Sequence, residues 1–121
     1  MSEQFADFEM EAMGLMKTML IVDDVAISRT IIEIMVSELP VVVIDEAADG
    51  REAVEKYKEY GPDIVVMDIA MHSMNGIEAL KEIIAYDPKA VVFIISSLGG
   101  QEYQIQEAME AGATAVFSKP A

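Results

Sequence analysis

The sequence predicts an α/β fold in which a doubly wound, five-stranded parallel sheet carries helices on its faces. Two observations predict it: five short apolar runs rich in β-branched residues, and four segments of helical period that alternate with them. Strands and helices that alternate along a chain form parallel sheets with right-handed crossovers. In such sheets the functional site lies beyond the carboxyl ends of the strands, so the search for chemistry begins there.

Each predicted strand is a run of the kind that is buried on both faces of a sheet. The runs are 19–22, 41–44, 64–67, 91–95 and 113–117. The segments between them carry apolar side chains at helical spacing, which we expect to face the sheet. These side chains are Ile27, Ile31, Ile34 and Met35; Ala53, Val54 and Tyr57; Ile77, Leu80 and Ile84; and Ile105, Ala108 and Met109.

Turn and capping residues separate the predicted elements at the expected places. Pro40 follows the first helix, Asp49-Gly50 opens the second and Gly61-Pro62 ends it, Asn75-Gly76 precedes the third, and Gly112 follows the fourth. The positions of these turn and capping residues therefore agree with the helix boundaries that the apolar periodicity predicts.

Composition bounds the class of protein. The chain has 121 residues, one domain's worth, with 53% apolar residues and a net charge of -14. This charge repels phosphate, so we expect no direct binding to nucleic acid. Cysteine is absent, which excludes thiolate chemistry. No signal peptide or run long enough for a bilayer stands out, so we expect a cytoplasmic protein without a membrane anchor.

Three acidic residues directly follow predicted strands. Asp23 and Asp24 come after the first strand and Asp68 after the third. The fold would bring their carboxylates together, and oxygen ligands completed by water and a phosphate suit Mg2+. An aspartate in such a place is also often solvated or caps a helix, which is the alternative for Asp24. The joint placement of all three favours the metal site.

A hydroxyl group and an ammonium group are expected at the same edge. Ser96-Ser97 ends the fourth strand, and Lys119-Pro120 follows the fifth. Taken singly, these residues are typical of loops and solvated surface. Beside three carboxylates, Lys119 could pair with Asp68 or with a phosphoryl oxygen.

These motifs resemble the receiver domain of two-component response regulators. The segments that carry the resemblance are LIVDD at 20–24, DIVVMDI at 63–69, MNG at 74–76, SS at 96–97, and AGA at 111–113 leading to SKP at 118–120. The likeness covers about residues 18–120 and is nearest to single-domain chemotaxis regulators of the CheY type. It implies a flavodoxin-like sheet with strand order 2-1-3-4-5.

The resemblance also implies a role for each site residue. Asp68 would be the nucleophile that takes a phosphoryl group from the phosphohistidine of a histidine kinase. Mg2+ would be held by Asp23, Asp24, Asp68 and the backbone carbonyl of Ala70. Ser96 and Lys119 would contact phosphoryl oxygens. The protein would modify itself, and would not turn over a small substrate as an enzyme does.

Two positions depart from the family pattern. His72 stands in the loop after the acceptor where proline is usual, and we expect an exposed loop residue there in preference to a phosphorelay or metal-binding role. Val116 stands where the family has the aromatic partner of Ser96 in its switch. Phe117 should point the opposite way, into the core, because strand side chains alternate. A loop shift linked to Ser96 remains as the expected switch.

The largest departure is the helix that the family has after its Lys-Pro motif, since the sequence ends at Ala121. An N-terminal segment, 1–17, precedes the receiver domain, 18–121, and Ser2 could cap its helix. It has a helical stripe of Phe5, Phe8, Ala12, Leu15 and Met16. Its helix would replace the absent one within the chain or by exchange between two copies, or it would form a homodimer as a leader helix.

Two classes of function follow. The first is a switch that binds a downstream target differently when phosphorylated. The second is a receiver-like assembly module that does not signal through phosphate. The five filled site positions favour the first class.

Overall fold

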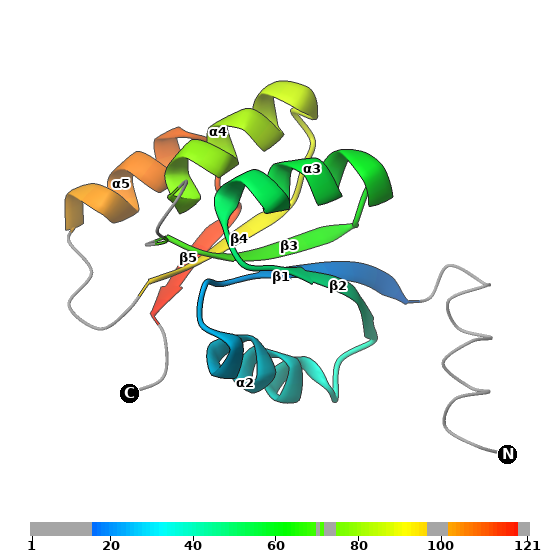
Figure 1. The fold of residues 1–121 in the computed structure, drawn as a ribbon. Helices are drawn as coiled ribbons and strands as arrows, with labels where there is room; N and C mark the ends of the chain where they lie inside the picture. Colours follow the sequence, from blue (N-terminus) through cyan, green and yellow to red (C-terminus); the bar gives the residue numbers. More distant parts are fainter. Residues whose placement is uncertain (1–15, 70, 72–74, 97–101, 119–121) are drawn as a thin grey trace, which may run out of the picture.

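The computed structural model describes residues 16–69, 71, 75–96 and 102–118 (Figure 1). Its elements are β1 (Lys17–Val22), α2 (Ala26–Val36), β2 (Val41–Ala47), α3 (Gly50–Tyr60), β3 (Ile64–Asp68), α4 (Gly76–Tyr86), β4 (Val92–Ser96), α5 (Glu102–Glu110) and β5 (Ala115–Ser118). All strand pairs are parallel, in the order β2-β1-β3-β4-β5. The predicted fold class and strand order are confirmed.

The helices cover the two faces of the sheet unequally. In Figure 1, α3, α4 and α5 lie on one face and α2 lies on the other. The larger core cluster joins α3, α4 and α5 to the sheet and includes Leu20, Met67 and Leu80. A smaller cluster beneath α2 includes Ile21 and Ile32. Four helices are present in the described part of the chain, as expected without a helix after β5.

Capping explains where two of the helices begin and end. Asp49 caps α3 by accepting a hydrogen bond from the backbone N–H of Glu52, and Asn75 does the same for α4 with Glu78. Gly61 ends α3 with a φ of 56°, in the left-handed region that favours glycine. The predicted helix starts at Asp49 and Asn75 and the predicted helix end at Gly61 are confirmed.

The predicted apolar stripe of α2 does not face the core as expected. Ile27 and Ile34 are about two-thirds exposed, and Ile31 and Met35 are about half exposed, whereas Ile32 is the buried residue of this helix. The stripe is broader than one contact with the sheet can bury, because no described helix lies beside α2 over β4 and β5. In α5, similarly, Ala108 is buried while Ile105 and Met109 are exposed.

Phe117 also differs from the prediction. It lies on the α2 face of the sheet and is 55% exposed, with its ring 5.9 Å from that of Phe93. Val116 points to the opposite face and packs against the larger core cluster. The alternation along β5 was therefore predicted correctly, but the face that receives Phe117 is not covered by any described helix.

The N-terminal segment lies outside the described residues up to Leu15. Met16 is described: it is buried, it is not helical, and it leads directly into β1 at Lys17. Among the residues that the structure describes, no helix is long and apolar enough to cross a membrane.

Candidate functional site

The three predicted carboxylates meet at the carboxyl edge of the sheet. Asp23 and Asp24 follow β1, and Asp68 is the last residue of the neighbouring strand β3. One carboxylate oxygen from each residue lies within 4.8 Å of those of the other two. Asp23 is fully buried, Asp68 is nearly so, and Asp24 is partly exposed. The chain thus places three acidic side chains from distant sequence positions around one point.

The alternative role of Asp24 as a helix cap does not fit the structure. The N-cap position of α2 is Val25, whose side chain makes no capping bond. Its backbone N–H instead donates to Oδ1 of Asp23, at 2.9 Å. The turn after β1 therefore holds the Asp23 carboxylate in place by a bond within the same loop.

Arg29 supports this turn and was not singled out from the sequence. Its Nη1 donates to the backbone carbonyl of Asp23 at 2.7 Å, and its Nε donates to Oε1 of Glu46 at 2.8 Å. The guanidinium thereby links the end of β1, the first turn of α2 and the end of β2. The sequence signal was its place in the first turn after the acidic pair, where a helix brings a side chain back toward the preceding loop.

Gly76 allows α4 to begin against the end of β3. A Cβ atom at this position would lie 2.2 Å from the backbone oxygen of Asp68 and 2.8 Å from Cα of Ile69. The N–H of Gly76 donates to the carbonyl of Ile69 at 2.9 Å. Sequence reasoning treated Asn75-Gly76 as helix punctuation, and this close approach to the site is a second reason for the glycine.

Ser96 lies at the same edge as the carboxylates. It is the last residue of β4 and is buried, and in the ladder between β3 and β4 its neighbour Ile95 is the partner of Asp68. In the ladder between β4 and β5 it is paired with Ser118, the residue before Lys119. Lys119, Ala70 and His72 lie outside the described residues, so their predicted roles stay predictions.

The donor set fits a hard divalent cation. Three carboxylates offer oxygen ligands only, which suit Mg2+ and leave room for water and a phosphoryl oxygen. Like charges this close and this deeply buried repel one another, and a cation between them removes the repulsion. The arrangement can therefore hold Mg2+ beside the carboxylate of Asp68.

Sequence comparison decides the family. The profile of the response regulator receiver domain matches residues 19–121. The chain belongs to the response-regulator receiver family. Chemotaxis protein CheY of Thermotoga maritima is 48% identical over 104 residues, which are 86% of each chain. CheY of Bacillus subtilis is 45% identical over 101 residues, which are 84% of this chain and 83% of the relative.

Solved receiver structures agree with the fold. CheY of Borrelia burgdorferi, in a complex with CheX, BeF3 and Mg2+, has a TM-score of 0.78 and 39% identity, over 87% of this receiver and 79% of that chain. The response regulator domain of Thermotoga maritima CheB has a TM-score of 0.77 and 42% identity over the same shares. The chain is thus a receiver of two-component signal transduction, similar to chemotaxis regulators.

Proposed function

We propose that this receiver is a phosphorylation-controlled switch in which Asp68 accepts a phosphoryl group from the phosphohistidine of a histidine kinase. The observation that carries the proposal is the cluster of Asp23, Asp24 and Asp68, whose carboxylate oxygens lie within 4.8 Å of one another. Phosphoryl transfer needs a positioned nucleophile and neutralised charge, and little else from the protein.

In the proposed reaction, a carboxylate oxygen of Asp68 attacks the phosphorus atom in line with the leaving imidazole nitrogen. The P–N bond of the phosphohistidine breaks as the new P–O bond forms, and the product is an aspartyl phosphate. Asp23, Asp24, Asp68 and the carbonyl of Ala70 would hold Mg2+. When bound, this ion would neutralise charge on the phosphoryl oxygens.

Ser96 and Lys119 complete the proposed site. The hydroxyl of Ser96 would donate a hydrogen bond to one phosphoryl oxygen, and the ammonium of Lys119 would neutralise another. Hydrolysis of the aspartyl phosphate by water would return the carboxylate and release phosphate. The domain would thus catalyse only its own phosphorylation and dephosphorylation.

Signalling would follow from a shift in the population of two conformations. Movement of Ser96 toward the phosphoryl group, beside Val116 on β5, would change the surface that a partner reads. The Borrelia burgdorferi relative was solved with the protein CheX, so a protein target is expected here too. We propose a cytoplasmic location, with residues 18–121 as the signalling unit. The acidic cluster favours this function over an assembly module that ignores phosphate.

Intact-mass spectrometry after incubation with Mg2+ and a small phosphodonor tests the proposal. The wild-type chain should gain the mass of one phosphoryl group, and removing Mg2+ with a chelator should abolish the gain. Asp68→Asn should show none. Asp63→Asn is the matched control, because Asp63 lies just before the opposite end of the same strand and accepts a hydrogen bond from the backbone N–H of Thr18. Equal labelling of both variants would refute the role of Asp68.

A further inference from the structure

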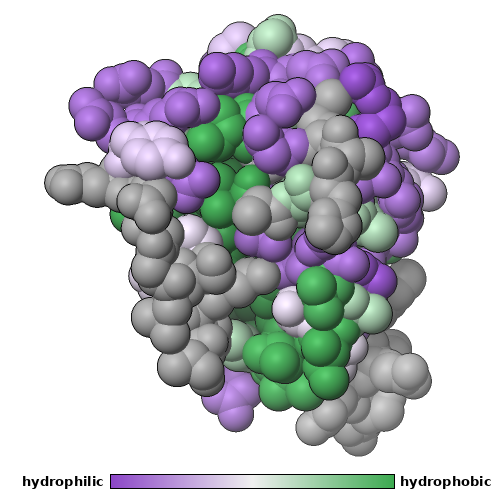
Figure 2. Space-filling model, turned by 60° about the vertical axis from the view of Figure 1, so that its left-hand side comes forward, coloured by the Kyte–Doolittle hydropathy of each residue, from purple (hydrophilic) through white to green (hydrophobic). Residues whose placement is uncertain are grey.

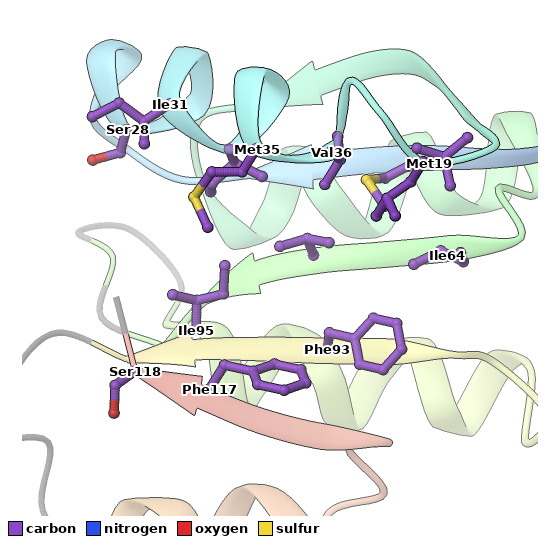
Figure 3. Close-up of a pocket in the computed structure, with 14 residues that line it drawn as sticks. Met19, Ser28, Ile31, Met35, Val36, Ile64, Phe93, Ile95, Phe117 and Ser118 are labelled. Carbon is purple, nitrogen blue, oxygen red and sulfur yellow. The ribbon is translucent and has the colours of Figure 1, made fainter. Parts of the chain in front are cut away.

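An apolar groove of about 520 Å3 runs between α2 and strands β4 and β5. Figure 3 shows Ile31 and Met35 of α2 on one side, facing Phe93, Ile95 and Phe117 of the strands. The floor is made by side chains of the central strands, Met19, Ile64 and Val66. Its side chains are almost all apolar, apart from Ser28 and Ser118, which lie toward the carboxyl ends of the strands in Figure 3.

The groove is part of a larger apolar surface. Figure 2 shows apolar side chains gathered in the lower half of one side of the molecule, at the height of α2 in Figure 1. Met35 is 58% exposed and Phe117 is 55% exposed, and Ile27 and Ile34 extend the surface over α2. A contiguous apolar surface of this kind marks a site of contact with another segment or protein.

We propose that the N-terminal segment of the same chain fills this groove, with residues 2–13 as a helix packed between α2 and the β4–β5 side of the sheet. The segment of residues 1–15 is the longest stretch of the sequence outside the described residues, and it precedes Met16 and strand β1 in the chain. Met16 is buried at the foot of β1, the strand whose Met19 lines the groove. The chain is therefore already tethered beside the site.

The length and the direction of the proposed N-terminal helix both fit the groove. A helix of about 12 residues is about 18 Å long, which is close to the roughly 16 Å of a five-residue strand such as β4. A helix that ends near the foot of β1 runs antiparallel to the strands. Gly14 can end a helix in the left-handed conformation. The residues from Gly14 to Lys17 then reach about 10 Å, which is about the separation of packed layers.

The chemistry of the segment also fits. Its first fifteen residues contain four acidic residues and no lysine or arginine. Phe5, Phe8 and Ala12 share one helical face, while Glu3, Asp7 and Glu11 lie off it. A helix laid in the groove would bury the aromatic face against Ile31 and Phe117 and leave the carboxylates in water.

The tether favours the chain's own segment over that of a second copy. A short linker gives an attached segment an effective concentration in the millimolar range. Another copy at micromolar concentration would compete poorly for the same groove. We therefore assign the groove to the segment of its own chain.

Disulfide trapping in the full chain tests the assignment, because the natural sequence has no cysteine. The variant carries Ala12→Cys and Met35→Cys, which the antiparallel helix would place in facing last turns. After mild oxidation, most chains should run on a non-reducing gel as an internally cross-linked monomer, and reduction should reverse the change. Neither residue is a member of the acidic cluster of Asp23, Asp24 and Asp68, so the test does not require phosphorylation.

Two control pairs distinguish docking from chance collision. Glu11→Cys with Met35→Cys has nearly the same tether but lies off the apolar stripe. Ala12→Cys with Glu33→Cys moves the partner to another face of α2, where Glu33 is exposed. Both should cross-link at least roughly tenfold less than the test pair. Cross-linking equal to the controls would overturn the proposal, and so would a product that is mainly a disulfide-linked dimer, which would assign the groove to a second copy.

Discussion

At the scale of single residues, Gly76 sets how closely α4 approaches the strand that carries Asp68. Any side chain there would overlap the backbone of Asp68 and Ile69, because its Cβ would lie 2.2 Å from a carbonyl oxygen. The carbonyl is part of the β3 backbone and cannot turn away as a flexible side chain would. A substitution must therefore move Asp68 or the helix.

We predict that Gly76→Ala lowers the free energy of unfolding by about 1–3 kcal/mol through overpacking and slows phosphorylation as well. Urea denaturation and the mass assay would measure the two effects. Gly61→Ala is the control: it strains a residue with a φ of 56° but has no atom within 4 Å of its added Cβ. It should lose stability and keep its phosphorylation rate. A Gly76→Ala protein that is phosphorylated normally would contradict this account.

The positions of the acidic residues could be predicted from the sequence, but the contacts that hold them in place could not. Asp23, Asp24 and Asp68 stand at strand ends in the sequence, and parallel strands bring such ends together. The two bonds from Arg29 to Asp23 and Glu46 depend on how α2 leaves the sheet, which a linear pattern does not specify. The close approach at Gly76 has the same origin.

At the scale of elements, α3 and α4 are joined by a buried tyrosine. The hydroxyl of Tyr57 in α3 donates to Oδ2 of Asp87, the C-cap of α4, at 2.7 Å, and its ring meets Tyr86 edge to face. Burial, together with the neighbouring Asp87, raises the pKa of Tyr57 well above its usual range. The same hydrogen bond lowers the pKa of Asp87.

These shifts predict how stability varies with pH. A raised folded pKa means that the contribution of Tyr57 is complete below its ordinary pKa of about 10 and is lost as the pH rises above it. A lowered folded pKa means that the contribution of Asp87 is present above its ordinary value and is lost on acidification below about pH 4. Tyr57→Phe removes the hydroxyl group that causes both.

We therefore expect Tyr57→Phe to lower the Tm by about 4 °C at pH 7 and to flatten the loss of stability above pH 10. Thermal melts followed by circular dichroism between pH 7 and 11 would measure both effects. Tyr60→Phe, at the exposed end of the same helix, is the control and should change neither. Identical alkaline profiles for wild type and Tyr57→Phe would show that the hydroxyl group is not responsible.

The helix α2 shows where prediction from periodicity fails. Its existence and position were predicted, but Ile27 and Ile34 were expected to face the sheet and are exposed. Periodicity reports which side chains are apolar and cannot report whether the element that would cover them is in place. The same reason accounts for Phe117, whose direction along β5 was predicted while its cover was not.

At the scale of the whole molecule, Mg2+ binding by the acidic cluster would be coupled to folding. The chain carries a net charge of -14, and the site gathers three carboxylates at the ends of two strands. A ligand that binds only the folded state stabilises it by mass action. Mg2+ should therefore stabilise the entire fold. The stabilisation should be larger than that produced by NaCl at the same ionic strength, which only screens charge.

We predict that Mg2+ at a hundred times its Kd raises the free energy of unfolding by about 2.7 kcal/mol. Urea denaturation at constant ionic strength, with NaCl replacing MgCl2, would measure the difference. The variant with Asp23→Asn and Asp24→Asn should lose this dependence on Mg2+. If NaCl stabilises the wild type as much as MgCl2 does, the carboxylates do not form a specific site.

The overall architecture was largely predictable because each local signal agreed with the global topology. Five strands, four helices and most turns followed from periodicity and capping, and the strand order followed from resemblance to receivers. The absence of a helix after β5 was expected, but the exposure of the apolar side chains of α2 and of Phe117 was not, because it depends on contacts between elements. Physical contact between elements, and not propensity within them, decides that question.

The most direct test of the central claim is to locate the phosphoryl group. The protein would be phosphorylated with a small phosphodonor and Mg2+, and the acyl phosphate would be reduced with borohydride. Peptide mass spectrometry should then find the reduced product of aspartate, homoserine, at position 68 and at no other acidic residue. Stable phosphate on Ser96 or His72, or homoserine at Asp23 or Asp24 in place of Asp68, would contradict the account.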